Sequence, residues 1–172
     1  HFVARKDYRK TYDVYKDDTL LNRQPKKSRK IFVCLDEQRG QYLVDGLVAM
    51  DFPLSSGVKA YPTKTGDYAV ISKKEDHASN LYGKMYDAEG KCINYNAEST
   101  DPIPEGGRFD GSPMPYWQRL TNAGLGLHVG KVRRHPVSHG CVRLPRNVAE
   151  ILYRQTSIGT PVTIQKTPLP VP

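Results

Sequence analysis

Apolar residues along this chain gather in short runs that polar turn signals separate, a pattern typical of a β-rich protein. Asp45-Gly46 separates two of these runs and is a strong β-hairpin signal. The runs predict strands at residues 31–35, 41–44, 47–54, 66–71, 124–129 and 160–164. We therefore expect a mostly β fold, built as a sheet or sandwich.

One segment has a helical period. Pro145 opens it, and Gly159 lies just beyond its end. An apolar i, i+3, i+4 stripe runs along it, formed by Val148, Ile151 and Leu152. The sequence therefore predicts one main helix near the C-terminal end.

Residues 1–30 lack an apolar period and alternate tyrosines with charged residues. They predict a basic N-terminal arm. Two interpretations of this arm are open: it carries a short helix near 5–16, or it is a solvated, partly disordered segment. A folded domain is then expected over 31–166, followed by a Pro-rich tail at 167–172.

A long excursion interrupts the strand pattern. Residues 98–115 contain four prolines and three glycines, so no regular element is expected there. With the residues before it, this stretch predicts a lid or binding loop over 73–112, because long loops in compact domains are usually functional.

Length and composition exclude several classes of protein. A chain of 172 residues suits one domain with a sizeable core, and no apolar run approaches the roughly 18 residues that a membrane span needs. The net charge of +8 indicates an anionic partner, and nucleic acid, membrane surface and cell wall all fit it. Residues 1–30 hold ten basic and four acidic side chains, so most of the excess lies there.

The chain has three cysteines, and an odd number leaves at least one thiol outside any intramolecular disulfide. Whether Cys34 pairs with Cys92 cannot be decided from the sequence. No signal-peptide pattern is visible, which leaves export open.

The densest chemistry lies in residues 127–145, where His128, His135, His139 and Cys141 fall close together. An imidazole can take the proton of a thiol and so activate it as a nucleophile. The same four side chains also form a plausible zinc ligand set, and a purely structural role is the third interpretation.

The heptapeptide Ser138–Leu144, with its Ser-His-Gly-Cys core and an upstream histidine, resembles the signature of the L,D-transpeptidase catalytic domain family (YkuD-like). The resemblance spans about 134 residues, Ile31 to Ile164. Further matches follow in the expected order at 53–57, 62–66, 114–116, 127–128 and 159–162.

This resemblance implies a sheet-rich L,D-transpeptidase fold with its main helix after the catalytic cysteine. Cys141 would be the nucleophile and His128, 13 residues earlier, the general base. The Val129 carbonyl would orient His128. The N–H groups of Gly140 and Cys141 would be the oxyanion donors.

The other motif residues receive paired interpretations. Arg143, where some members carry Asn, would bind a substrate carboxylate or form an internal salt bridge. His139 would contact substrate or hold the turn, and Ser138 would brace that turn or contact substrate. Tyr116 and Trp117 would line the donor groove or pack in the core.

The implied substrates are peptidoglycan stem peptides. The thioacyl-enzyme would release a terminal D-residue and pass its acyl group to an amine on a second stem, a protein or a D-amino acid. The alternatives are an L,D-carboxypeptidase or amidase that uses water, and a non-catalytic cell-wall-binding or zinc-binding domain.

No cofactor, no metal and no nucleic acid is expected, and the implied location is the bacterial envelope, in the periplasm or cell wall. The arm would give at most peripheral contact with a wall or membrane surface. A second basic cluster brackets Cys141 and suits substrate carboxylates; it consists of Lys131, Arg133, Arg134, Arg143 and Arg146.

Overall fold

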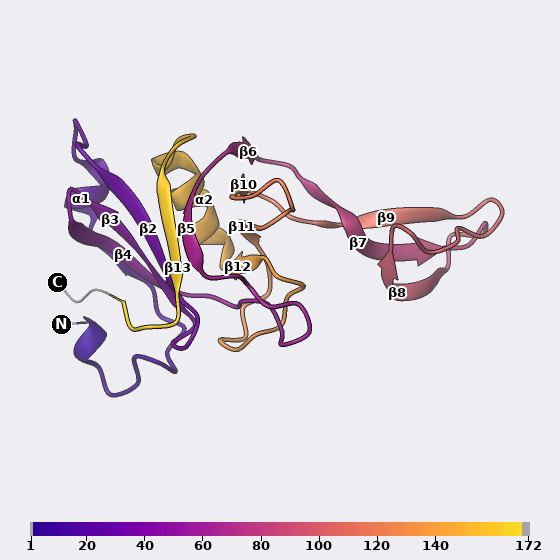
Figure 1. The fold of residues 1–172 in the computed structure, drawn as a ribbon, viewed down its shortest axis with the longest axis horizontal. Helices are drawn as coiled ribbons and strands as arrows, with labels where there is room; N and C mark the ends of the chain where they lie inside the picture. Colours follow the sequence, from indigo (N-terminus) through magenta and orange to yellow (C-terminus); the bar gives the residue numbers. More distant parts are fainter. Residues whose placement is uncertain (1, 170–172) are drawn as a thin grey trace. The chain divides into compact units, whose positions relative to one another are not determined.

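A computed structural model describes residues 2–169 of the chain (Figure 1). The chain forms two compact units. The larger unit comprises His1–Lys73 and Tyr116–Pro172, and the smaller unit is Lys74–Pro115. Among the residues described, no helix has the length and apolar character needed to span a membrane.

The larger unit contains a six-stranded sheet in the order β1-β4-β3-β2-β13-β5. Its strands are β1 (Tyr15–Lys16), β2 (Arg29–Cys34), β3 (Arg39–Val44), β4 (Leu47–Pro53), β5 (Gly66–Ala69) and β13 (Pro161–Gln165). The predicted hairpin is confirmed, since Asp45 and Gly46 have φ of 51° and 79°, as a type I′ turn requires.

A four-stranded sheet in the order β12-β11-β10-β6 completes the larger unit. Its strands are β6 (Ser72–Lys74), β10 (Trp117–Arg119), β11 (Gly126–Val129) and β12 (Val142–Leu144). The predicted helix is present as α2 (Arg146–Gln155). Lys73 Nζ donates to the carbonyl oxygens of Tyr153 and Thr156, satisfying acceptors that the end of α2 leaves open.

The apolar stripe of α2 packs into the same core as both sheets of the larger unit. Val148 and Leu152 are fully buried, together with Leu127 of β11 and Ile31 of β2. The sheet-rich fold with one main helix is therefore confirmed. Burial of these side chains stabilises each by about 1.5 to 3 kcal/mol relative to exposure.

The smaller unit is a three-stranded antiparallel sheet in the order β8-β7-β9, with β7 at Ala78–Tyr86, β8 at Cys92–Glu98 and β9 at Arg108–Pro113. The expectation that 98–115 holds no regular element is therefore wrong. β9 is an edge strand whose proline is its last residue, and proline is tolerated at such edges. A role for 73–112 as a lid stays a prediction.

The N-terminal segment differs from the predicted arm. Its residues include a short 3-10 helix (Phe2–Ala4), β1 on the edge of the large sheet, and α1 (Asp18–Asn22). Asp17 caps α1 by accepting the Leu20 N–H, and Leu20 and Leu21 are buried. The solvated interpretation is wrong for Leu20 and Leu21, because their side chains are part of the core, and Val14 packs against it.

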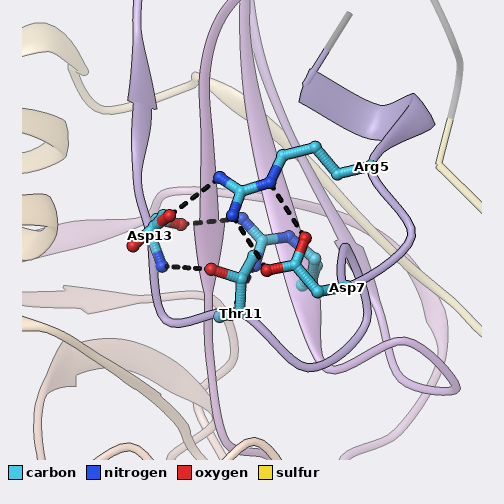
Figure 2. Close-up of polar contacts among 5 residues, drawn as sticks. Arg5, Asp7, Thr11 and Asp13 are labelled. Carbon is cyan, nitrogen blue, oxygen red and sulfur yellow. Dashed lines mark hydrogen bonds and ion pairs between the residues drawn. The ribbon is translucent and has the colours of Figure 1, made fainter.

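Turns, rather than the helix expected near 5–16, occupy the first part of this segment (Figure 2). Arg5 donates through Nε and Nη2 to both carboxylate oxygens of Asp7, and through Nη1 to Asp13 at 2.7 Å. The Asp13 N–H donates to Thr11 Oγ1. The Arg5 contacts join side chains two and eight positions apart, in place of the i, i+4 pairs that a helix would form.

A buried ion pair holds the same segment on the sheet. Arg39 and Asp51 are 0% and 1% exposed, and Nε donates to Oδ1 at 2.7 Å. Tyr8 donates its hydroxyl hydrogen to Asp51 Oδ2, and Arg39 also donates to the carbonyl oxygens of Thr11 and Asp13. The guanidinium lies 4.7 Å from the Tyr8 ring centroid. Burial and the Asp51 charge raise the pKa of the Tyr8 hydroxyl, so it remains protonated.

The end of the chain lies partly outside the described residues. Leu169 of the predicted tail is buried, whereas residues 170–172 of that tail are not described.

Candidate active site

The parallel pairing of β11 with β12 brings the predicted nucleophile and base to one place. Leu127 pairs with Val142, and His128 pairs with Arg143. His128 and Arg143 lie on one face of this pair. Cys141 comes directly before Val142, in the bend that leads into β12 next to β11. Leu127 and Val142, on the other face, are buried in the core.

The thiol of Cys141 lies against the end of the β10–β11 hairpin. Its Sγ donates to the Gly124 carbonyl at 3.2 Å. Burial raises the pKa of the thiol, whereas the Gly126 amide and the charges of Arg119 and Arg143 lower it. Burial is the largest of these effects, so the thiol needs a base to become a thiolate.

His128 is 7% exposed and has the orientation that the family resemblance implies. Its Nδ1 lies 2.7 Å from the Val129 carbonyl oxygen. A carbonyl can only accept, so Nδ1 carries the hydrogen, and in the neutral imidazole Nε2 is then the nitrogen with a lone pair. The Trp117 ring packs at 6.1 Å from the His128 ring, centroid to centroid.

The turn before Cys141 is held by Ser138, which is 3% exposed. Ser138 Oγ donates to the Cys141 carbonyl oxygen and accepts the Gly140 N–H at 3.1 Å. Gly140 has φ of +120°, a conformation that side chains rarely adopt. These contacts support the bracing interpretation of Ser138. They also show the Gly140 N–H, predicted as an oxyanion donor, engaged within the turn.

Two segments that the resemblance highlighted anchor the loop around Cys141. Thr63 Oγ1 accepts the Gly57 N–H at 2.8 Å and donates to the Gly140 carbonyl at 2.6 Å. Ser55 exchanges backbone hydrogen bonds with Arg143, in the bridge that joins the two residues. The motifs at 53–57 and 62–66 therefore fix the loop that carries the nucleophile.

A second set of contacts holds the 130–138 loop. Ser55 Oγ accepts the N–H groups of Arg133 and Arg134, and the Ser56 carbonyl accepts those of Val137 and Ser138. Ser56 itself is held by the Gln38 side chain, whose amide both donates to it and accepts from it.

Arg143 is half-buried, and its aliphatic stem lies over Gly130, where an added Cβ would be 2.7 Å from Arg143 Cγ. Among residues 2–169 it makes no ion pair with a carboxylate, so the internal salt-bridge interpretation is not supported. Burial lowers its pKa, and the nearby Cys141 raises it.

The predicted aromatic residues have different environments. Trp117 is 2% exposed and packs beneath His128, which fits the core interpretation. Tyr116 is half-buried and contacts the Tyr153 ring edge-on at 5.5 Å. His139 is exposed, and its ring lies 4.9 Å from that of Tyr61.

The zinc interpretation finds no support in the described part of the chain, where no three His, Cys, Asp or Glu side chains assemble into a metal-binding group. His135 is exposed, with Nδ1 3.3 Å from the Pro136 carbonyl oxygen. The three cysteines are unpaired within residues 2–169; Cys34 is buried, and Cys92 and Cys141 are half-buried.

A model of the YkuD family, the L,D-transpeptidase catalytic domain, matches residues 28–164. The chain belongs to this family. The probable L,D-transpeptidase 3 of Mycobacterium tuberculosis is 31% identical over 121 residues, which are 66% of this chain and 38% of that protein. The chain thus spans well under half the length of this relative.

Solved L,D-transpeptidase structures share the fold. One from Mycobacterium smegmatis has a TM-score of 0.61 and 22% identity, covering 80% of this chain and 58% of its own. A cysteine-to-serine mutant from Enterococcus faecium has a TM-score of 0.58 and 27% identity, covering 80% and 50%.

The catalytic roles of Cys141 and His128 in this L,D-transpeptidase family domain stay predictions, and the structure shows supporting residues that were not predicted. His128 and Arg143 are paired across β11 and β12, and Ser138 and Gly140 build the turn that precedes Cys141. Ser55 and Thr63 were not assigned roles, although they lie in the family-like motifs at 53–57 and 62–66. Their small hydroxyl side chains give no local signal of partners about 80 residues away.

Proposed function

We propose that this chain is a cysteine-dependent L,D-transpeptidase acting on peptidoglycan stem peptides. The observation that carries the proposal is the parallel pairing of β11, which contains His128, with β12, which begins at the residue after Cys141. The hydrogen bond from His128 Nδ1 to the Val129 carbonyl also selects the tautomer that a general base needs, with the lone pair on Nε2.

In acylation, the Cys141 proton passes to His128 Nε2, and the thiolate attacks the carbonyl carbon of the bond before the terminal D-residue. A tetrahedral oxyanion forms, and the Cys141 N–H is the donor proposed for it, because the Gly140 N–H is engaged by Ser138. The C–N bond then breaks. The imidazolium returns its proton to the leaving amine, and a thioester remains on Cys141.

Deacylation reverses these roles. An acceptor amine loses a proton to His128 Nε2 and attacks the thioester, and the sulfur leaves as the Cys141 thiolate. The acceptor would be a second stem peptide, a protein amine or a D-amino acid. Water in its place would give an L,D-carboxypeptidase, which remains the second candidate because both acceptors meet the same thioester.

Arg143 is the proposed partner of a substrate carboxylate. Its guanidinium is half-buried beside the nucleophile with no carboxylate paired to it in the described residues, and a bidentate contact would suit it. His139 is a proposed substrate contact because it is exposed, and the half-buried Tyr116 is proposed to line the donor groove. For Ser138 we propose the bracing role.

The proposed substrate places the reaction in the bacterial envelope, where we propose that the protein works after export. The basic N-terminal segment would give at most peripheral contact with an anionic wall or membrane surface. Its packing on the sheet leaves exposed lysines and arginines available for this contact.

The test is incubation of the protein with a disaccharide-tetrapeptide, followed by mass spectrometry of the products. Cys141→Ala should abolish all product, whereas Cys92→Ala, a half-buried thiol of the smaller unit, should retain wild-type turnover. Cross-linked dimer indicates the transpeptidase and tripeptide indicates the carboxypeptidase. Product formation by Cys141→Ala would overturn the proposed mechanism.

A further inference from the structure

A second arginine lies near Cys141, outside the motif that contains the cysteine. Arg119 is the last residue of β10 and is half-buried. Like Arg143, it makes no ion pair with a carboxylate among residues 2–169. A partly desolvated guanidinium without a counter-ion interacts strongly with any negative charge that forms nearby.

Strand pairing puts Arg119 in the hairpin that contacts the Cys141 thiol. Arg119 is the Cα partner of Gly126 in the antiparallel β10–β11 pair. The Cys141 thiol donates at 3.2 Å to the Gly124 carbonyl, two residues from Gly126 in the same hairpin. The hairpin that contacts the thiol therefore also carries the Arg119 charge.

Packing limits where the Arg119 side chain can move. Its guanidinium carbon lies 5.4 Å from the Trp117 ring centroid, and Nη1 makes a long contact of 3.4 Å with the Thr121 carbonyl. Trp117 is 2% exposed and packs against His128, so it is a rigid support. The single long hydrogen bond leaves most of the positive charge uncompensated.

We propose that Arg119 is a positioning residue that stabilises the thiolate of Cys141 electrostatically. When the Sγ proton passes to His128 Nε2, the new negative charge faces Arg119 on β10 and Arg143 on β12. Arg143 is assigned to a substrate carboxylate in the proposed function, so Arg119 is the cation that remains for the thiolate. The catalytic consequence rests on that proposed function, whereas the effect on the thiol does not.

The electrostatics of the site agree with this geometry. Burial raises the pKa of Cys141, and the charges of Arg119 and Arg143 oppose that shift. The titratable and charged groups around the thiol are His128 on β11, Arg143 on β12 and His139 in the preceding turn. A cation at close range lowers an acidic pKa by about one to three units, so loss of Arg119 should be measurable.

The test is the pH dependence of Cys141 alkylation by iodoacetamide, followed by peptide-resolved mass spectrometry. In Arg119→Gln the midpoint should move to higher pH by about one unit, with alkylation at pH 7 about tenfold slower. Arg119→Lys keeps the charge and should restore most of the wild-type profile. Arg154→Gln removes a charge from an exposed position on α2 and should change nothing.

Cys92 is the internal control, because its alkylation profile should be the same in every variant. Should Arg119→Gln fail to fold, Arg119→Met keeps an apolar stem over the Trp117 ring and gives the same prediction. A Cys141 profile in either neutral variant that superimposes on wild type would overturn the proposal. Alkylation uses no peptidoglycan, so failure of the Arg119 proposal can be told apart from failure of the proposed function. Turnover by Cys141→Ala would overturn only the proposed function.

Discussion

Arginines in two regions of the larger unit have opposite electrostatic surroundings. Arg39 is fully buried, pairs with Asp51 and donates to two backbone carbonyls, so its charge is compensated within the fold. Arg119 and Arg143 flank a half-buried thiol and have no carboxylate partner among residues 2–169.

The first arginine is a charge that holds the fold, and the other two are charges available for chemistry. A compensated buried pair fixes the segment that it contacts, and breaking it leaves an unpaired charge. An uncompensated cation beside a nucleophile is available to a thiolate or a substrate carboxylate. Changes in the first region should therefore affect stability, and changes in the second should affect reactivity.

The largest effect is expected at the catalytic face. His128→Ala removes the proposed base, and acylation should slow by about 10² to 10⁴-fold. The urea midpoint should remain near that of wild type. Single-turnover acylation of Cys141 measures the rate, and wild-type acylation in this variant would show that another group takes the proton.

Breaking the buried pair should instead unfold the protein more easily. Asp51→Ala leaves Arg39 buried without its counter-ion and should cost about 3 to 5 kcal/mol of unfolding free energy, measured in urea. The double variant Arg39→Met/Asp51→Leu should recover much of that loss. If the unfolding free energy of Asp51→Ala were within about 1 kcal/mol of wild type, the Arg39–Asp51 pair would not be holding the fold.

The exposed Arg5 cluster should have the smallest effect. The Arg5 hydrogen bonds hold the pKa of Asp7 and of Asp13 below the usual range, and both carboxylates are solvent-exposed (Figure 2). The cluster therefore stabilises the fold above the unfolded-state pKa of about 3.9, and this stability is lost as pH falls through the lower folded pKa. Melting curves of Asp7→Asn and wild type should differ slightly at pH 7 and coincide in 1 M salt. A difference that persists in salt would argue against a screened surface pair.

Much of the sheet could be predicted because its signals are local. The Asp45-Gly46 turn and the apolar runs predicted β2, β3 and β4 within a few residues, and the 3.6-residue stripe predicted α2. Residues 1–30 gave no such signal. Their few apolar residues pack on a sheet formed by distant parts of the chain, and β9 was missed because proline and glycine obscured an edge strand.

Site residues that belong to one contiguous motif could be proposed from the sequence. Site residues that come together from distant parts of the chain could not. Ser138 to Arg143 form one string, whereas Ser55, Thr63 and Arg119 reach the turn or the thiol through loop packing and strand pairing. Likewise, Arg39 and Asp51 look like solvated polar positions of their strands. Only their pairing across β3 and β4 shows that they are buried partners.

The most direct test of the central claim is covalent trapping with a tetrapeptide-stem muropeptide, with rapid acid quenching and peptide mapping by mass spectrometry. We expect the stem, shortened by its terminal D-residue, to be attached to the peptide that contains Cys141, and no such adduct on the Cys34 or Cys92 peptides. Two results would contradict the role of Cys141 as nucleophile: turnover with the acyl group trapped on another residue, or no trapped acyl group together with a fully active Cys141→Ala variant.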